Sequence, residues 1–428
     1  MPRLPVPDLD DAVSWTTQHL GHLALEGPDG VAASLRFVGG QTAADEAIAD
    51  FDVRGYAAQR SEVLPEESRG ASGLSPYIRH GLLPLPRVWD HVSGGPSRDV
   101  AKYRDELLWQ EYSRHVYARV GTGIRRPLRR EPAVGHGWEG EAYRDDMACM
   151  AEVRRELVQD GWLVNQTRLW AASQWTVRAG WDWREGERAL YRHLVDGSPA
   201  ANGVGWQWAV GAGTGKPYGF SRWQVEKRAP GLCASCPLRR ACPIQDFPPA
   251  QSGEQVPNAP GLAEDPDPEA TAGPLIAQVD GVPEAVWLTA ESLGDADPAL
   301  AAHPDLPAVF VFDEPLLRGL RLSGKRLVFL AETLADLAER RPVELHLGAV
   351  PQELAARPLA ATWAPVPGFQ LRAAQLDLAE QHPWPWLRRP AGGSARSFTA
   401  WAQHHGGSPG SAGRSGGRPG GPRRGHRR

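Results

Sequence analysis

The sequence WDWREGERALYRHLVDGSPAANGVGWQWAVGAGTG, residues 181–215, decides the fold of this chain. Tryptophans stand near both of its ends and just upstream, at positions 175, 181, 183, 206 and 208. Between them, residues 185–194 have the apolar spacing of a helix, and the small residues of DGSPAANGVG are typical of a loop. Tryptophan buries a large apolar area at little cost in rotamer freedom, so this cluster builds either a core or a flat stacking surface.

The composition indicates a globular protein with more than one domain. A chain of 428 residues with 41% hydrophobic content can form two or three cores. Its net charge of -4 includes six arginines in the last 26 residues, so any nucleic-acid contact by the rest needs a local basic patch. We find neither a membrane-length apolar run nor a secretion signal, and we expect a cytoplasmic protein without a membrane partner.

The spacing of apolar residues changes along the chain. Residues 41–51, 103–120 and 147–175 have helical spacing, whereas 31–40 is typical of a strand or turn. Short apolar runs at 285–289, 308–312 and 343–347, with a helical segment at 325–340, predict a small α/β unit with parallel strands.

We therefore predict a mostly α-helical domain, a small C-terminal α/β domain of Rossmann-like type, and a disordered tail. The expected segments are an N-terminal extension (1–34), the helical domain (35–250), a Pro/Gly-rich linker (251–275), the α/β domain (276–385) and a basic Gly/Arg-rich tail (386–428).

Six motifs, in order along the chain, resemble those of the photolyase and cryptochrome family. They are FVGGQTAADEAI at 37–48, Tyr56 with Arg60, ASGLSPYIRHG at 71–81, ELLWQEY at 106–112, GWLVNQTRLW at 161–170 and the DWREGER to GWQW stretch at 182–208. The last motif is long and unusual, which makes the signal specific. The resemblance covers roughly residues 35 to 225 and implies the family's helical FAD-binding domain.

The resemblance implies which residues hold FAD. The phosphates and ribose would lie at Tyr56, Ser72, Leu74 and Ser75, the flavin ring between Arg168 and Asp196 with Ser198 at the same edge, and flavin N5 at Asn202. Ala71 replaces a family threonine, and Ser198 replaces a second acid. From the residues alone, Arg168 with Asp196 is equally a structural ion pair and Ser75 a helix N-cap.

The resemblance also implies light-driven electron transfer through tryptophans. Trp206 and Trp183 match the first two members of the chain that reduces the photoexcited flavin, and Trp138 and Trp181 are the candidates for the third. Each of these tryptophans could instead be a core residue.

The expected contacts with damaged DNA match the family in part. Glu106, Trp109, Asn165 and Trp208 stand where photolyases hold the flipped pyrimidine dimer. The replacements in this region are Gln110 and Gln166 for arginines, Leu169 for methionine and Val164 for histidine. The two lost cations weaken the attraction to phosphates.

The four cysteines form a candidate metal site. Cys233, Cys236 and Cys242 have C-x2-C-x5-C spacing, and Cys149 could supply a fourth thiolate for a [4Fe–4S] cluster or for zinc. A branch of bacterial photolyases and cryptochromes carries a similar cysteine order. The alternative is three surface thiols and one buried one.

The segment after the linker resembles the first half of the family's antenna domain, which here follows the FAD-binding domain instead of preceding it. Thr289, Glu291 and Ser292 stand where the family has the arginines of its opening motif. Their absence argues against a second chromophore and favours a structural role.

The sequence thus predicts an FAD-binding blue-light flavoprotein. The first interpretation is a deoxyribodipyrimidine photo-lyase, a carbon–carbon lyase acting on cyclobutane dimers with Trp183, Trp206, Asn202 and Glu106 as its catalytic residues. The alternatives are a cryptochrome-like light sensor without repair activity and a DNA-binding scaffold that has lost FAD.

Overall fold

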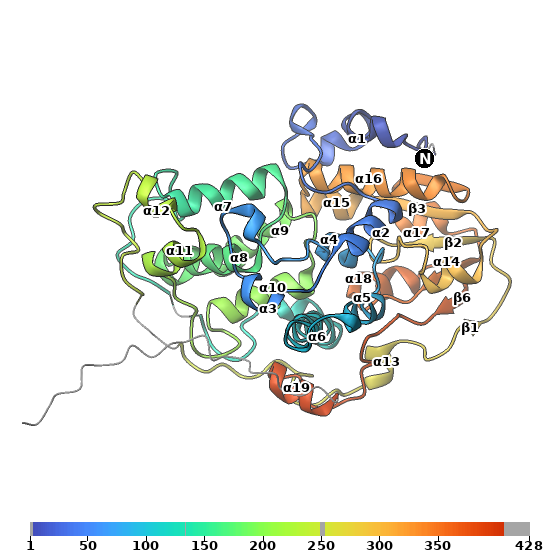
Figure 1. The fold of residues 1–428 in the computed structure, drawn as a ribbon. Helices are drawn as coiled ribbons and strands as arrows, with labels where there is room; N and C mark the ends of the chain where they lie inside the picture. The colour runs from blue at the N-terminus through green and yellow to red at the C-terminus, as the bar shows by residue number, and fades with distance from the viewer. Residues whose placement is uncertain (1–2, 133, 249–252, 406–428) are drawn as a thin grey trace, which may run out of the picture.

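Helices dominate the computed structural model, which describes residues 3–132, 134–248 and 253–405 (Figure 1). The helices of the first part are α1 (Ala12–Leu20), α2 (Gln41–Asp50), α3 (Tyr56–Gln59), α4 (Ser75–Arg79), α5 (Leu85–His91), α6 (Ser97–Val120), α7 (Ala148–Gln159), α8 (Asn165–Ala172), α9 (Trp183–His193), α10 (Pro199–Ala209), α11 (Arg222–Arg228) and α12 (Leu232–Ser235). Those of the second part are α13 (Pro268–Ala272), α14 (Pro298–Ala302), α15 (Glu314–Leu320), α16 (Gly324–Ala338), α17 (Val350–Leu354), α18 (Pro367–Ala373) and α19 (Phe398–His404).

A six-stranded sheet forms the centre of the second part. Its strands are β1 (Gln278–Val279), β2 (Ala285–Leu288), β3 (Ala308–Asp313), β4 (Val343–Gly348), β5 (Leu359–Thr362) and β6 (Leu378–His382), in the spatial order β1-β6-β5-β2-β3-β4. All neighbours pair in parallel except β1 and β6. Every residue of β2 and β5 is buried, as expected for parallel strands covered on both faces. The predicted fold class, including the parallel α/β unit, is confirmed.

Helix α16 joins the two parts of the molecule. It packs against α1 and α2 (Figure 1), and its Glu332 and Asp336 carboxylates accept hydrogen bonds of 2.7 Å from the N–H groups of Gly39 and Gln41. A Cβ on Gly39 would collide with the carbonyl oxygen of Phe329. The backbone can therefore lie this close to α16 only because residue 39 is glycine. The hydrophobic core is continuous across this contact.

Glu332 makes the stability of this contact dependent on pH. Burial raises the pKa of Glu332 to about 7, although the hydrogen bond from Gly39 opposes the rise. A carboxyl pKa that is higher in the folded state stabilises the protein below the unfolded value of 4.5, and this contribution is lost as pH rises through 7.

We expect Glu332→Gln, which keeps an acceptor for Gly39, to remove this loss and to exceed the wild type in stability near pH 8 by at most about 3 kcal/mol. Urea unfolding near pH 5 and pH 8 measures the difference. An equal decline in both proteins would show that Glu332 does not cause it.

The predicted loop at residues 196–205 is wrong from Pro199 onward. Helix α10 begins there, because Ser198 caps it by accepting the N–H of Ala201 and Pro199 occupies a position that needs no N–H donor. Its glycines fit close packing: a Cβ on Gly203 would press against Ile124. Residues 31–40, left open between strand and turn, contain no strand.

The predicted linker and tail also need correction. Part of the linker packs on α6, where Asp265 forms a buried ion pair with Arg119 (3.0 Å). Residues 386–405 are ordered rather than disordered, since α19 buries Phe398 and Trp401 against α6. Low complexity here reflects glycines between aromatic anchors. The basic stretch 406–428 lies outside the described residues.

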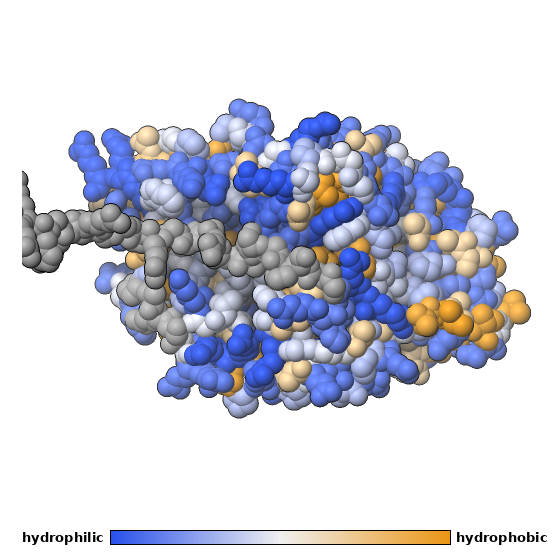
Figure 2. All heavy atoms as spheres, turned by 60° about the horizontal axis from the view of Figure 1, so that its bottom comes forward, coloured by the Kyte–Doolittle hydropathy of each residue, from blue (hydrophilic) through white to orange (hydrophobic). Residues whose placement is uncertain are grey.

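Two surface findings complete the fold. In the described ranges, no helix is long and apolar enough to cross a membrane. Leu275, Ile276, Val279 and Val282 are largely exposed around β1. Figure 2 shows apolar side chains gathered at this end of the molecule.

Candidate functional site

The residues predicted to hold the FAD phosphates lie together beside α6. Tyr56 begins α3 and packs edge-on against Tyr103 at 4.8 Å between ring centroids. The Tyr103 hydroxyl donates to Ser72 Oγ (3.2 Å), which also accepts the N–H of Leu74 (3.4 Å). Ser75 Oγ accepts from Trp162 Nε1 (2.9 Å) and can still donate its own proton.

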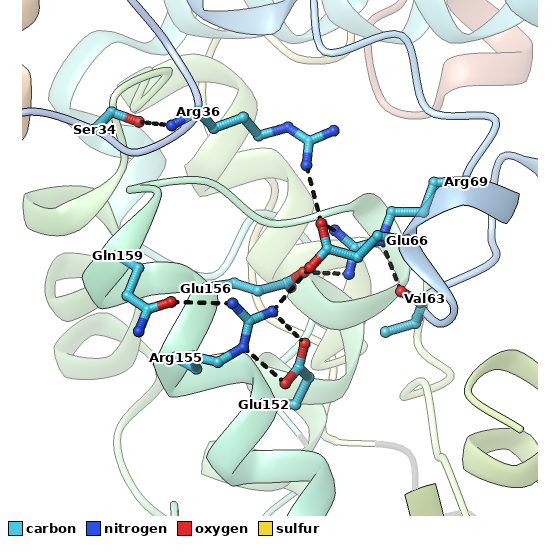
Figure 3. A network of polar contacts seen from close by, with 9 residues as sticks. All are labelled: Ser34, Arg36, Val63, Glu66, Arg69, Glu152, Arg155, Glu156 and Gln159. Carbon is cyan, nitrogen blue, oxygen red and sulfur yellow. Dashed lines mark hydrogen bonds and ion pairs between the residues drawn. The ribbon is translucent and has the colours of Figure 1, made fainter. Parts of the chain in front are cut away.

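An ion-pair network fixes the segment that leads into this loop (Figure 3). Glu66 contacts Arg36 (3.5 Å) and Arg155 (3.1 Å), and Arg69 pairs with the buried Glu156. The carboxylates of Glu66, Glu152 and Glu156 lie close enough to hold a cation, but these arginines already neutralise them. The cluster therefore anchors the segment to α7 and has a structural role.

Arg168 and Asp196 form a partly buried pair between α8 and the start of α10. Arg168 Nη2 lies 2.7 Å from Asp196 Oδ2, and Arg168 Nε donates to the carbonyl of Leu163 (2.9 Å). Asp196 Oδ1 is buried and has no hydrogen-bond partner among the described residues. An unsatisfied buried carboxylate oxygen is costly, so this atom is suited to a ligand that donates a hydrogen bond.

Asn202 of α10 has a fixed orientation. Its Nδ2 donates to the backbone carbonyl (3.1 Å) and to Oε1 (2.6 Å) of Glu187 on α9. Only the NH2 end of the amide can donate to a carboxylate, so Oδ1 is the end left for another partner.

A small pocket lies where the helical part meets the carboxyl ends of β2 and β5. Ser198 lines it together with Gln110 and Arg114 of α6 and Glu291 and Val366 of the α/β part. Its enclosed space of about 30 Å³ has room for a water molecule but not for a flavin ring. Among the predicted FAD residues, Ser198 is the one on its wall.

The tryptophans are arranged in a row that the sequence predicted only in part. Trp206 and Trp183 are buried. A Cβ on Gly186 of α9 would touch both Trp206 and Trp175, so these two rings meet over this glycine. Trp175 then contacts Trp181 at 4.8 Å between centroids.

The surface end of this row is Trp181, with 37% of its area exposed. Trp138, the other candidate, donates its Nε1–H to the carbonyl of Glu141 (3.1 Å). Trp175 was not among the tryptophans predicted to carry electrons. It is a neighbour of Trp206 because both side chains lie against Gly186.

The four residues expected to contact DNA differ in exposure and in their partners. Glu106 pairs with Lys102 (2.8 Å) and Arg60 (3.3 Å). Asn165 is exposed at the start of α8. Trp208 is 37% exposed and lies 5.9 Å from the ring of Tyr218.

Trp109 is covered on one face by the C-terminal segment. Phe398 of α19 stacks on it with ring centroids 4.1 Å apart and an interplanar angle of 9°. The Tyr112 hydroxyl holds α19 through the carbonyl of Ala395 (3.0 Å), and Trp401 Nε1 donates to His115 Nδ1 (2.8 Å). This face of Trp109 is therefore closed to a base while α19 stays in place.

The cysteines gather around α7, the end of α8 and α12. Burial, and then the negative charges of Cys233, Cys242 and Cys236, raise the pKa of Cys149 to about 12. Among the described residues, the groups of three or more ligating side chains within 4.8 Å of one another include none of the four sulfurs. The thiols are thus neighbours, but no three of their sulfurs lie within 4.8 Å of one another.

Comparison with known proteins identifies the helical part. Residues 103–227 match the FAD binding domain of DNA photolyase. Over this segment the chain is similar to the photolyase family. The photolyase match includes Arg168, Asp196, Asn202 and both predicted tryptophans, whereas Ser72, Ser75 and the C-x2-C-x5-C cysteines lie outside it.

The curated relatives of this chain have moderate identity to it. Deoxyribodipyrimidine photo-lyases of Synechococcus (30% over 186 residues, 40% of this chain and 36% of the relative) and Vibrio cholerae (31% over 163 residues, 35% of each) are similar to it. A class III photolyase structure from Agrobacterium tumefaciens shares 26% identity at a TM-score of 0.34, over 40% of this chain and 37% of that one. The chain spans about a third of the length of the curated photolyases it matches.

Proposed function

We propose that this protein is an FAD-binding, blue-light flavoprotein that repairs cyclobutane pyrimidine dimers by electron transfer. The carrying observation is the Arg168–Asp196 pair, whose Oδ1 is buried without a partner inside the segment that matches a photolyase FAD-binding domain. Purified protein without bound flavin, and unable to take up added FAD, would overturn this proposal.

The donors of the site fit FAD. Ser72 and Ser75 would offer hydroxyls to the pyrophosphate, and Arg168 would place a positive charge beside an electron-rich ring while Asp196 holds the guanidinium in position. Asn202 Oδ1 would accept a hydrogen bond from a protonated flavin N5. When bound, FAD supplies the light absorption and the one-electron chemistry.

Trp206, Trp175 and Trp181 would conduct an electron inward from the surface. In this assignment Trp175 follows Trp206, and Trp181 is the tryptophan at the surface. Trp183 remains the candidate for an alternative electron path. Glu106 and Trp208 would hold the dimer, by a carboxyl contact to the base edge and by stacking.

A light sensor without repair activity is the second candidate, because Phe398 occupies a face of Trp109.

Removing this ring with Phe398→Ala is expected to strengthen binding of dimer-containing single-stranded DNA several-fold, since stacking of one base on an aromatic side chain is worth about 1–3 kcal/mol. Fluorescence anisotropy measures the affinity.

Thr399→Ala, on the exposed side of the same helix, is the control for this prediction. Thermal unfolding of both variants shows whether α19 still packs. Unchanged DNA affinity in a folded Phe398→Ala protein would mean that the covered face of Trp109 does not receive the base.

The cysteines support a [4Fe–4S] cluster over zinc. A tetrahedral zinc site places its four sulfurs about 3.8 Å apart, whereas no three of these sulfurs lie within 4.8 Å of one another. A cluster spreads its thiolates over four irons. The charges of Cys242 and Cys149 also act on Arg178, and those of Cys233 and Cys242 on Arg222, so cations stand beside an anionic cluster.

Anaerobically purified protein should contain iron and acid-labile sulfide, and Cys236→Ala should lose both because it removes a buried ligand. Ser235→Ala, at the neighbouring exposed position, should keep them. Zinc without iron would contradict the cluster.

A further inference from the structure

A group of three side chains in the α/β part, far along the chain from the flavin site, has the composition of a metal centre. His303 Nε2 lies 2.7 Å from Glu380 Oε2, and His382 Nε2 lies 3.0 Å from the same oxygen. The ligating atoms of all three lie within 4.8 Å of one another. The two imidazole rings are nearly perpendicular (87°) with centroids 5.9 Å apart.

The fold holds these side chains in place. Glu380 and His382 are two residues apart on β6, so they point to the same face of the sheet. His303 directly follows α14, which packs against β5 and β6. Asp297 fixes that helix, because its buried Oδ1 accepts the N–H groups at the helix start and the hydroxyl of Thr362 on β5 (2.7 Å).

The charge around the group favours a cation. Glu380 forms ion pairs with the two histidines, and no lysine or arginine of the described ranges pairs with it. The carboxylate cluster at Glu66, Glu152 and Glu156 differs in this respect, since it has Arg36, Arg69 and Arg155 as counter-ions. Arg341, near His303, donates instead to the carbonyl oxygens of Leu300 and His303.

We propose that His303, Glu380 and His382 bind a divalent transition-metal ion, zinc above all, that links α14 to the strand β6. Two imidazoles and a carboxylate are ligands of zinc, which binds nitrogen at about 2.0–2.1 Å and leaves ligand atoms about 3.3 Å apart in a tetrahedron. The present separations reach this value by small side-chain rotations. Each neutral ring would carry its proton at Nδ1 and offer Nε2 to the metal.

The site is partly open to solvent, which provides an entry path and a place for a fourth ligand. The side chains of His303, Glu380 and His382 expose 20%, 13% and 9% of their area. Water can complete the tetrahedron.

Cobalt(II) chloride is the probe that separates this site from the cysteines. Cobalt bound by thiolates gives intense near-ultraviolet charge-transfer bands, and cobalt bound by imidazole and carboxylate gives only visible ligand-field bands. We expect the full chain to bind one equivalent of cobalt without thiolate bands, to release it to added zinc, and to gain thermal stability with zinc.

The partly exposed ligand His303 is the residue to change first, as His303→Ala, with Glu380→Gln as a second variant that keeps the size of the side chain. Both should lose the thiolate-free cobalt spectrum and the zinc-dependent rise in Tm, while the exposed His22→Ala control keeps both. The proposal is overturned if wild-type protein binds cobalt only with thiolate bands, or if both variants retain the thiolate-free spectrum.

Discussion

Replacing Asp196 with asparagine is expected to deprive the protein of most of its bound FAD while leaving the fold intact. Asparagine keeps the shape of the side chain and one acceptor for Arg168, but it removes the negative charge that fixes the guanidinium (2.7 Å). A hydrogen bond to a charged group is worth about 1.5–3 kcal/mol, so the affinity for FAD should fall about 10- to 150-fold. Flavin fluorescence titration of the apoprotein measures the change.

Asp52→Asn is the matched control, because Asp52 also pairs with an arginine, Arg54, at a distance of 2.9 Å, but at the surface. This variant should bind FAD like the wild type. Equal affinities in all three proteins would show that the Arg168–Asp196 pair is structural only. Thermal unfolding separates a loss of affinity from a loss of folding.

Changing Trp206 to phenylalanine is expected to abolish most of the photoreduction of bound flavin. Phenylalanine preserves the buried aromatic packing, although it is far harder to oxidise than tryptophan. Trp175→Phe should slow photoreduction similarly. Trp175 and Trp206 both lie against Gly186, and Trp175 also contacts the exposed Trp181. Blue-light bleaching of the oxidised flavin, with an external reductant, measures the rate.

The comparison of Trp175→Phe with Trp183→Phe decides between the two rows. If Trp183→Phe alone slows the reaction, electrons follow the pair expected from the family resemblance, and the row through Trp175 is wrong. Trp223→Phe is the control: Trp223 is 58% exposed on α11, and its ring contacts Lys227.

The strands and the long helices could be predicted because their patterns are local. The apolar runs of β2, β3 and β4 alternate with helices, and α16 has a helical pattern throughout. The start of α10 could not be recognised, because glycines and a proline are typical of loops. Its capping serine and the packing of Gly203 against Ile124 override that composition.

Pairs of side chains within the recognised motifs could be predicted from the sequence. Contacts between segments far apart in the chain could not. Arg168 and Asp196 form the expected pair, but Phe398 on Trp109 joins residues 289 positions apart, within a segment whose glycines resemble a disordered tail. Tyr103, Trp175 and Tyr218 likewise became candidate site residues only through their spatial neighbours. Periodicity contains no information about such contacts.

The most direct test of the proposed function is repair by the purified full chain with fully reduced FAD. Single-stranded DNA containing cyclobutane dimers is mixed with the protein, and intact pyrimidines are quantified after blue light and after an equal time in the dark. The account predicts restoration in the light only, and to a greater extent with Phe398→Ala. No restoration in either protein, with reduced flavin bound, would contradict repair and leave light sensing as the function.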